Sequence, residues 1–155
     1  MPVSIRRAVP EDAPVLARMR WDDSTDDGTP SAESLALFVE GFTEFVRSSL
    51  ASDQWAIWVA ESDGRVVAHI YVQIVEKVPR PGRFAARWGY ATAVYAERGA
   101  RNKGIGSCLL RRVIDWAKHQ ELELLLLWPS EGSVPFYERA GFVRSPEALE
   151  LHLDS

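Results

Sequence analysis

The chain has 155 residues, of which 46% are hydrophobic and 26% are charged, and its formal net charge at pH 7 is −4. This size and composition are typical of one globular domain, so we expect a single domain over residues 1–155. The acidic balance argues against nucleic-acid binding, because phosphate backbones are bound by many Lys and Arg side chains. No apolar run is long enough to span a membrane or to form a secretory leader, so we expect a cytoplasmic protein that binds no membrane.

The residues that most often build disulfides and metal centres are sparse. Cys108 is the single cysteine, so no internal disulfide can form, and its expected role is packing of a helix. His69, His119 and His152 are scattered without the spacing of metal ligands, and each is expected to be an ordinary strand or surface residue. The sequence therefore predicts no metal site.

In the first half of the chain, the hydrophobic pattern changes from the period of helices to that of strands near residue 55. Apolar residues spaced by three and four predict helices, whereas β-branched and aromatic runs on either side of Ser62–Arg65 predict a hairpin. The expected elements are a strand at 3–9, a helix starting at 10–14 and ending near 21, a polar loop at 22–30, a helix from 31–34 to 50, and strands at 55–61 and 66–75.

The second half is predicted to contain a strand, a glycine-rich loop, a helix and another strand in succession. Such a succession is typical of a parallel strand pair, whose ligands bind at the carboxyl ends of the strands. The expected elements are a strand at 87–96, a helix at 104–120, a strand at 122–128, a helix at 133–140 and two closing strands at 142–144 and 147–153.

The glycine-rich segment Arg101–Ser107 (RNKGIGS) lies between a predicted strand and a predicted helix. Backbone N–H groups and the positive helix end therefore converge there, and Gly104 and Gly106 let an anion approach the main chain. The segment is not a nucleotide P-loop, because Ile105 and Gly106 stand where Lys and Ser/Thr are required. A dinucleotide fingerprint would need a third glycine, where the chain has Leu109. The structural alternative is a helix start with permissive glycines and solvated basic residues.

Two motifs resemble the signatures of the GNAT superfamily of N-acetyltransferases. Residues 94–110 are similar to its donor-binding motif, [RQ]-x-x-G-x-[GA] after a strand, and residues 130–142 are similar to its helical Phe-Tyr pair before a Gly-Phe step. The resemblance extends over residues 55–142. The chain departs from the family at 96–98, where a proline is frequent, and at Ser130, where Asn is frequent.

The resemblance implies an α/β (α+β) fold with one central mixed, mostly antiparallel sheet, a splayed parallel strand pair and about four flanking helices. It also implies acetyl-CoA as the acyl donor and a primary amine of a small molecule or peptide as the acceptor, joined by direct transfer in a ternary complex. A main-chain N–H near Val94 or Tyr95 would polarise the thioester carbonyl. The residues implied to bind acetyl-CoA are Val94, Tyr95, Ala96, Arg101, Asn102, Lys103, Gly104, Ile105, Gly106, Ser107, Ser130, Ser133 and Tyr137.

Two residues are candidates for proton transfer. Tyr137 is the expected general acid, since a neutral phenol can protonate the departing CoA thiolate, and the alternative is aromatic packing beside Phe136. The sequence does not identify the base that deprotonates the amine, and both Glu97 and a water route stay open. A non-catalytic acyl-CoA-binding module, which needs the glycines but not Tyr137, is the alternative function.

The resemblance implies that the region between the first two helices borders the acceptor side, and the charge of this region predicts the kind of acceptor. Acidic side chains beside Trp21 would attract a cationic amine, although a solvated loop is the competing interpretation. These acidic residues are Asp22, Asp23, Asp26 and Asp27. Trp21 and Trp88 are kept as candidates for the acceptor pocket. The oligomeric state is left open, with a homodimer as one option.

Overall fold

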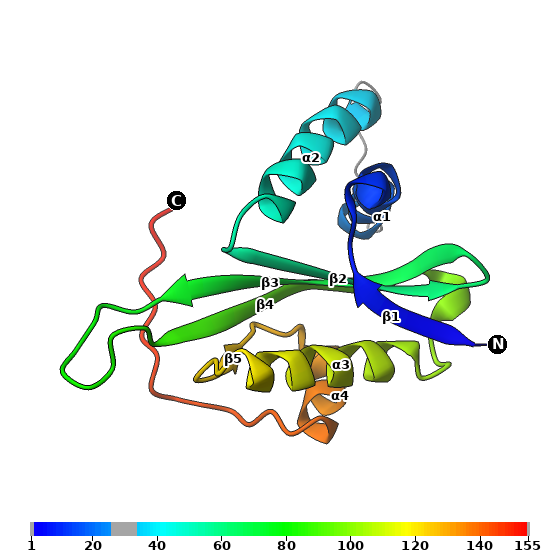
Figure 1. The fold of residues 1–155 in the computed structure, drawn as a ribbon. Coiled ribbons are helices and arrows are strands. Elements are labelled where there is room, and N and C mark those ends of the chain that lie inside the picture. The colour runs from blue at the N-terminus through cyan, green and yellow to red at the C-terminus, as the bar shows by residue number, and fades with distance from the viewer. Residues whose placement is uncertain (1, 26–33, 155) are drawn as a thin grey trace.

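The computed structural model describes residues 2–25 and 34–154. One five-stranded sheet with the spatial order β1-β2-β3-β4-β5 forms the centre of the molecule (Figure 1). The elements are β1 (Val3–Arg7), η1 (Pro10–Asp12), α1 (Ala13–Ser24), α2 (Ser34–Leu50), β2 (Trp55–Ser62), β3 (Arg65–Glu76), β4 (Arg87–Ala96), η2 (Arg98–Ala100), α3 (Ile105–His119), β5 (Leu125–Leu126), η3 (Glu131–Ser133) and α4 (Val134–Arg139), where η marks a 3₁₀ turn.

The sheet is mixed and mostly antiparallel, as predicted. β1, β2, β3 and β4 pair antiparallel in sequence order, and β5 pairs parallel to β4. The β2–β3 turn places Asp63 and Gly64 at φ values of 54° and 73°, which is the left-handed geometry of tight hairpins. The parallel pairing follows from the crossover through α3, which returns the chain to the edge of β4.

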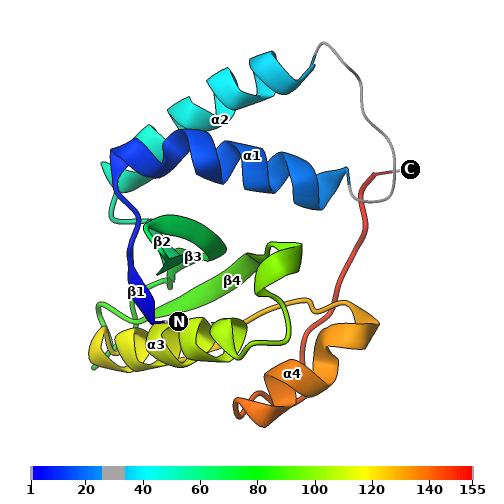
Figure 2. The same ribbon diagram turned by 90° about the vertical axis from the view of Figure 1, so that its right-hand side faces the viewer.

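Helices cover both faces of the sheet. Figures 1 and 2 show α1 and α2 on one face and α3 and α4 on the other. Side chains of β3 alternate between the two hydrophobic cores: Tyr71 packs in the α1/α2 core with Leu16, and Ile70 packs in the α3 core with Leu109 and Val113. The sheet is therefore buried between two helical layers.

A buried ion pair joins β1 to the start of α1. Asp12 accepts hydrogen bonds from the Arg6 guanidinium at 2.8 and 3.0 Å and from the Val9 backbone N–H at 2.8 Å. Arg6 also contacts Glu61 at 2.8 Å. Burial alone would raise the pKa of Asp12, but the bonds from Arg6 and Val9 outweigh it and lower that pKa.

Several boundaries differ from the sequence prediction. β5 comprises two residues rather than the predicted 122–128, and α1 continues to Ser24 instead of ending near Trp21. Both predicted closing strands, 142–144 and 147–153, are wrong, because residues 142–154 form no strand. The alternation of leucines there supplies a strand-like face, but a strand also needs a partner edge, and this segment pairs with none of the described strands.

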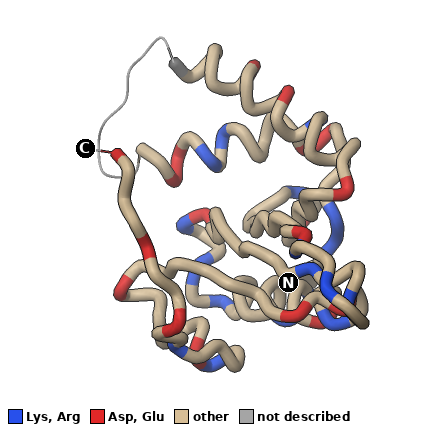
Figure 3. The backbone as a smooth tube through the Cα atoms, turned by 90° about the vertical axis from the view of Figure 1, so that its left-hand side faces the viewer, with Lys and Arg blue, Asp and Glu red and all other residues tan. Residues whose placement is uncertain are grey.

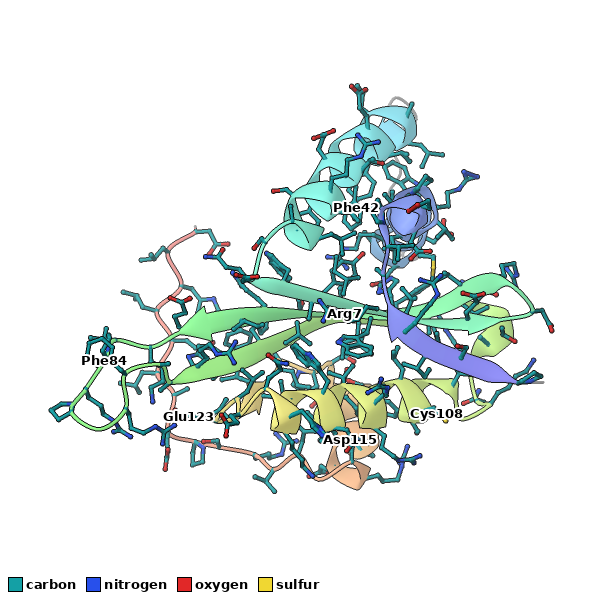
Figure 4. The ribbon with its side chains drawn as sticks, viewed as in Figure 1. Arg7, Phe42, Phe84, Cys108, Asp115 and Glu123 are labelled. Carbon is teal, nitrogen blue, oxygen red and sulfur yellow. The ribbon has the colours of Figure 1, made fainter. Side chains whose placement is uncertain are left out.

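Cys108 corrects a further expectation. It is exposed on α3 (Figure 4), so it does not contribute to helix packing as predicted. The buried side of α3 is formed by Ile105, Leu109, Leu110 and Val113. Basic and acidic residues occur in both helical layers (Figure 3). No helix in residues 2–25 and 34–154 has the length and apolar character needed to cross a membrane.

Candidate active site

β4 and β5 separate at the centre of the molecule. Their parallel pairing consists of Gly89 with Leu125 and Tyr90 with Leu126, and β4 then continues to Ala96. Gly89 allows the close approach, since a Cβ there would lie 2.7 Å from Leu125 Cδ2. The later part of β4 therefore pairs with β3 alone in the sheet.

A β-bulge lies in this later part of β4. His69 pairs with Tyr95 and Tyr71 pairs with Thr92, so the register shifts by one residue between them. Ala93 has a φ of 53°, which is uncommon for a residue with a Cβ. Bulges redirect backbone groups and are frequent next to active sites. The next two residues, Val94 and Tyr95, are those whose main-chain N–H is predicted to polarise the thioester.

The glycine-rich segment caps the start of α3 without a side chain. Gly104 is the N-cap residue, has a φ of 78° and makes no side-chain capping bond with a described residue. The first bond of the helix runs from the Cys108 N–H to the Gly104 carbonyl at 3.1 Å, so the N–H groups of residues 105–107 precede the helical ladder. A Cβ on Gly104 would meet nothing within 4 Å, which leaves open space beside these amides.

The other residues of this segment have distinct positions. Ile105 is buried in the α3 core, while Asn102, Lys103 and Ser107 are exposed. A Cβ on Gly106 would lie 3.4 Å from the ring of Phe136, so this glycine sits at the contact with α4.

Arg101 is held by the end of β4. Its Nε donates to the Ala96 carbonyl at 2.8 Å, and its guanidinium carbon lies 5.3 Å from the centre of the Tyr95 ring. The structure thus brings four of the predicted donor-binding positions, 95, 96, 101 and 104, to one end of β4 and the adjoining loop.

Tyr137 lies on α4 on the same side of the sheet as α3. It is buried, and its ring contacts the rings of Phe136 and Phe142 at centroid distances of 5.0 and 5.7 Å. Burial raises the pKa of its phenol. Tyr137 also lines a cavity of about 870 Å³ between α3, the β5 region, α4 and the chain after α4. Its surroundings are therefore apolar and keep the phenol protonated.

Ser130 and Ser133 form a local cluster at the start of η3. The Ser130 hydroxyl donates to the Ser133 hydroxyl at 2.9 Å, and the Ser133 hydroxyl donates to the Ser130 carbonyl at 2.9 Å. Both hydroxyl protons are used within this pair, so these hydroxyls would accept hydrogen bonds from a bound ligand rather than donate them.

Glu97 follows β4 and is paired with Arg65. The two guanidinium nitrogens contact its two carboxylate oxygens at 2.5 and 3.2 Å. The Glu97 carboxylate is therefore held by a cation at the end of β4.

The α1/α2 face is lined by aromatic rings. Trp21 of α1 contacts Phe38 of α2 at a centroid distance of 5.7 Å, whereas the other predicted pocket residue, Trp88, is half-buried at the start of β4. Asp22 is exposed, and Asp23 pairs with Arg20 at 3.3 Å. The other two acidic residues of the predicted acceptor loop, 26 and 27, lie outside the described residues.

Sequence reasoning missed two buried polar residues beside the bulge. His69 and Tyr71 lie on β3, the strand opposite the bulge, and their relative exposures are 0% and 3%. The spacing of two polar rings within a hydrophobic strand was the available signal. The described residues contain no group of three His, Cys, Asp or Glu side chains that could hold a metal ion.

Comparison with known proteins gives the same family as the motifs. A model of the acetyltransferase (GNAT) family matches residues 17–142. A glucosamine 6-phosphate N-acetyltransferase of Trypanosoma brucei brucei is 27% identical over 97 residues, which is 63% of this chain and 64% of that protein. The chain thus matches somewhat less than two thirds of that relative's length.

Solved structures share the fold over nearly the whole chain. A predicted acetyltransferase from Clostridium acetobutylicum with acetyl-CoA is 25% identical, with a TM-score of 0.78 and coverage of 97% of this chain and 96% of that one. A GCN5-related N-acetyltransferase from Ralstonia eutropha JMP134 is 24% identical, with a TM-score of 0.75 and coverage of 97% and 99%. The resemblance, the fold class and the enzyme class predicted from the motifs are confirmed, and the chain belongs to the GNAT acetyltransferase family.

Proposed function

We propose that this chain transfers the acetyl group of acetyl-CoA to a primary amine of a small molecule or peptide. The amine nitrogen attacks the thioester carbonyl within a ternary complex, and no covalent enzyme intermediate forms. As the N–C bond forms, the C–S bond breaks, the amine loses a proton and CoA leaves as the thiol. Holding both substrates side by side can remove up to about 7–11 kcal/mol of the barrier.

The observation that carries this proposal is the left-handed Gly104 cap at the start of α3, directly after β4. The unpaired amides of the first helical turn and the positive helix end favour an anion, here the pyrophosphate of acetyl-CoA. The acetyl-CoA present with the Clostridium acetobutylicum protein supports the same donor. The donor-binding residues that we propose are Val94, Tyr95, Ala96, Arg101, Asn102, Lys103, Gly104, Ile105, Gly106, Ser107, Ser130, Ser133 and Tyr137.

The bulge in β4 supports a role for main-chain groups in the chemical step. Beyond the bulge, an N–H of Val94 or Tyr95 donates to the thioester carbonyl oxygen and stabilises the negative charge that develops during attack. β4 does not pair with β5 beyond Tyr90, and in this proposal the pantetheine arm lies along that unpaired edge of β4.

We propose Tyr137 as the general acid that protonates the CoA sulfur. Its raised pKa keeps the phenol protonated at neutral pH, and its position on α4, against α3, favours access to the donor side. Glu97 remains the candidate for accepting the amine proton, by itself or through water. Its ion pair with Arg65 holds the carboxylate at the end of β4.

The acceptor is a primary amine whose surroundings are aromatic and acidic. Trp21 and Phe38 supply the aromatic part, and Asp22 supplies exposed negative charge next to them. A cationic amine fits this combination. The curated relative acts on an amino sugar phosphate, as its name states, so glucosamine 6-phosphate is a second acceptor to be tested.

The test is an acceptor screen with purified protein and acetyl-CoA. Polyamines, aromatic amines, glucosamine 6-phosphate and acidic amino acids are supplied separately, thiol release is followed continuously, and the acetylated product is identified by mass spectrometry. We expect amine-dependent thiol release and a product heavier by one acetyl group. Tight acetyl-CoA binding with no acetylated amine would instead support the non-catalytic acyl-CoA-binding module.

A further inference from the structure

We propose that His69 is a positioning residue that fixes the β4 bulge at Ala93, and so aims the backbone N–H groups that polarise the thioester. The inference rests on the proposed acetyl transfer and names a residue that lies outside the two motifs that resemble the family signatures. It is carried by the position of His69 opposite the bulge, by its burial and by its contacts with β4.

His69 is sealed inside the protein. Its relative exposure is 0%, and neither ring nitrogen has a hydrogen-bond partner among the described residues. The Tyr71 hydroxyl, two residues along the same strand, is also buried without a partner there. Buried polar groups without partners are rare because burial removes their bonds to water. Two such residues, His69 and Tyr71, flank the position where the register of β4 shifts.

The bulge is the feature that these residues surround. β3 pairs His69 with Tyr95 and Tyr71 with Thr92, so the extra residue of β4 lies between them. The alternation of β4 side chains between the two faces of the sheet also shifts here. Ala91 belongs to the α3 core, whereas Ala93, two residues later, packs against the α1/α2 core. Because Ala93 holds a φ of 53°, its conformation must be maintained by the groups around it.

His69 contacts β4 just beyond this strained position. Its ring stacks on Tyr95 at a centroid distance of 5.6 Å and an interplanar angle of 30°. Arg101 contacts the same Tyr95 ring: its guanidinium carbon lies 5.3 Å from the ring centre, and its Nε donates to the Ala96 carbonyl. A continuous set of contacts thus runs from His69 through Tyr95 to the glycine-rich segment.

The pKa of His69 reflects both its burial and the nearby Ala93 backbone. Desolvation is the largest influence on His69 and lowers its pKa to about 4, while the Ala93 backbone raises it. A nearby carbonyl raises the pKa of an imidazole, so the Ala93 carbonyl is the group that acts on the ring, although it makes no hydrogen bond to either ring nitrogen in this structure. At neutral pH the ring is uncharged and carries one N–H. In the proposed role, this N–H donates to that carbonyl in the acetyl-CoA complex and holds the peptide plane between Ala93 and Val94.

The test compares substitutions that separate the ring from its N–H. His69→Phe keeps an aromatic ring against Tyr95 but has no donor. His69→Asn places an amide nitrogen near the Nδ1 position, and His69→Gln places one near Nε2. Tyr71→Phe is the matched control, because it removes the neighbouring buried hydroxyl and leaves the imidazole.

Two readouts are used besides turnover. The affinity for acetyl-CoA is measured by calorimetry, and the carbonyl stretching frequency of bound ¹³C-labelled acetyl-CoA is measured by infrared spectroscopy. We expect His69→Phe to bind acetyl-CoA within about threefold of wild type, to lose roughly tenfold or more in kcat, and to show a carbonyl band nearer that of the free thioester. Either His69→Asn or His69→Gln should restore part of both the band shift and kcat, and Tyr71→Phe should change neither.

A His69→Phe variant with the wild-type carbonyl band and kcat overturns the inference, as does equal loss in His69→Phe, His69→Asn and His69→Gln. If His69→Phe does not fold, the comparison of His69→Asn with His69→Gln decides, because a packing role predicts no preference for one amide position. The infrared band is read without an acceptor. Failure of every amine to be acetylated would therefore count against the proposed function while the band still tests His69.

Discussion

On the α3 face of the sheet, the donor site that we propose is built mainly from main-chain amides of one continuous segment, from the end of β4 to residues 105–107. On the α1/α2 face, the acceptor site that we propose is built from side chains drawn from separate elements, such as Trp21 of α1 and Phe38 of α2. A site made of backbone requires glycines and fixed spacing, which are visible in the sequence. A site made of side chains from several elements has no such local sequence motif.

The two faces also differ in their chemistry. The α2 side carries a row of aromatic contacts that ends on the sheet, with centroid distances of 5.4 Å for Phe38–Phe42, 5.4 Å for Phe42–Phe45 and 5.4 Å for Phe45–Trp55. Figure 4 shows Phe42 between α2 and the sheet. Such rings recognise size and shape. The donor side instead offers polar amides, which suit a phosphate common to every acetyl-CoA reaction.

The largest effect is expected from a side chain in the backbone site. Gly104→Val should reduce acetyl-CoA affinity at least about a hundredfold, roughly 2.7 kcal/mol, because its side chain fills the open space beside the helix amides. Calorimetry with acetyl-CoA measures this loss.

The control for that variant is Gly64→Val in the β2–β3 turn. Gly64 has a φ of 73°, close to the 78° of Gly104, and open space around it. It therefore has a similar backbone cost of about 1–2 kcal/mol away from the site. Equal losses of acetyl-CoA affinity in both variants would mean that strain, not ligand contact, explains Gly104.

A second effect is expected at the point where the two substrates meet. Tyr137→Phe should lower kcat by roughly ten- to a thousandfold, with little change in the KM for acetyl-CoA, because only the proton donor is lost. Steady-state kinetics with the best amine measure it. Wild-type kcat in this variant would return Tyr137 to a packing role between Phe136 and Phe142.

The pH dependence sharpens the same prediction. A general acid works only while protonated, and burial raises the pKa of Tyr137 above the ordinary phenol value of about 10. The wild-type kcat should therefore not fall between about pH 7 and 9.5 through loss of this proton. A descending limb in that range that disappears in Tyr137→Phe would contradict the raised pKa.

A smaller effect, on stability alone, is expected where β1 meets α1. Asp12→Ala should lower the free energy of unfolding by about 1–3 kcal/mol, because the Val9 N–H loses its acceptor and Arg6 loses one of its two carboxylate partners. Asp115→Ala, at an exposed position of α3 (Figure 4), is the control and should change stability by less than about 0.5 kcal/mol.

Acid should reduce the difference between wild type and Asp12→Ala. The folded pKa of Asp12 is lowered, so its contribution is present above the unfolded value of about 3.9 and is lost as the pH falls through the folded pKa. Chemical denaturation at pH 7 and at about pH 3 measures this. A difference that grows on acidification would show that the pairing with Arg6 is not its source.

The smallest effect is expected from the acidic residues at the acceptor side. Changing Asp22, Asp23, Asp26 and Asp27 to Asn should raise the KM for a cationic amine about two- to fivefold at low salt, and the effect should vanish at high salt because exposed charges are screened. Steady-state kinetics at two salt concentrations measure it. An unchanged KM at low salt, or an anionic best acceptor, would leave these residues without a part in recognition.

How well each part of the fold could be predicted also depends on whether its features are local in the sequence. β4 has the bounds predicted for it, 87–96, and α3 differs from its prediction by one residue at each end, because strand and helix patterns are local. The last strands fail because pairing depends on a partner edge that no local pattern specifies. The prediction for Cys108 was wrong because spacing alone does not decide whether a residue near the border of the apolar stripe of a helix is buried or exposed.

The candidate site shows the same difference between residues that are contiguous in sequence and residues that only the fold brings together. The glycine-rich segment could be predicted because the loop and the helix start are contiguous in sequence. His69 could not be predicted, since the role that we propose for it depends on a bulge in the neighbouring strand β4, and a bulge has no fixed sequence signature. The ion pair of Glu97 with Arg65 joins residues that the sequence gives no reason to associate.

The most direct test of the donor site is a titration of ¹⁵N-labelled protein with acetyl-CoA, followed by the chemical shifts of the backbone amides. The account predicts that the largest changes occur at Ile105, Gly106 and Ser107, followed by Val94 to Ala96, and that the α1/α2 layer changes less. Unchanged amides at residues 105–107 with saturable changes elsewhere would contradict it.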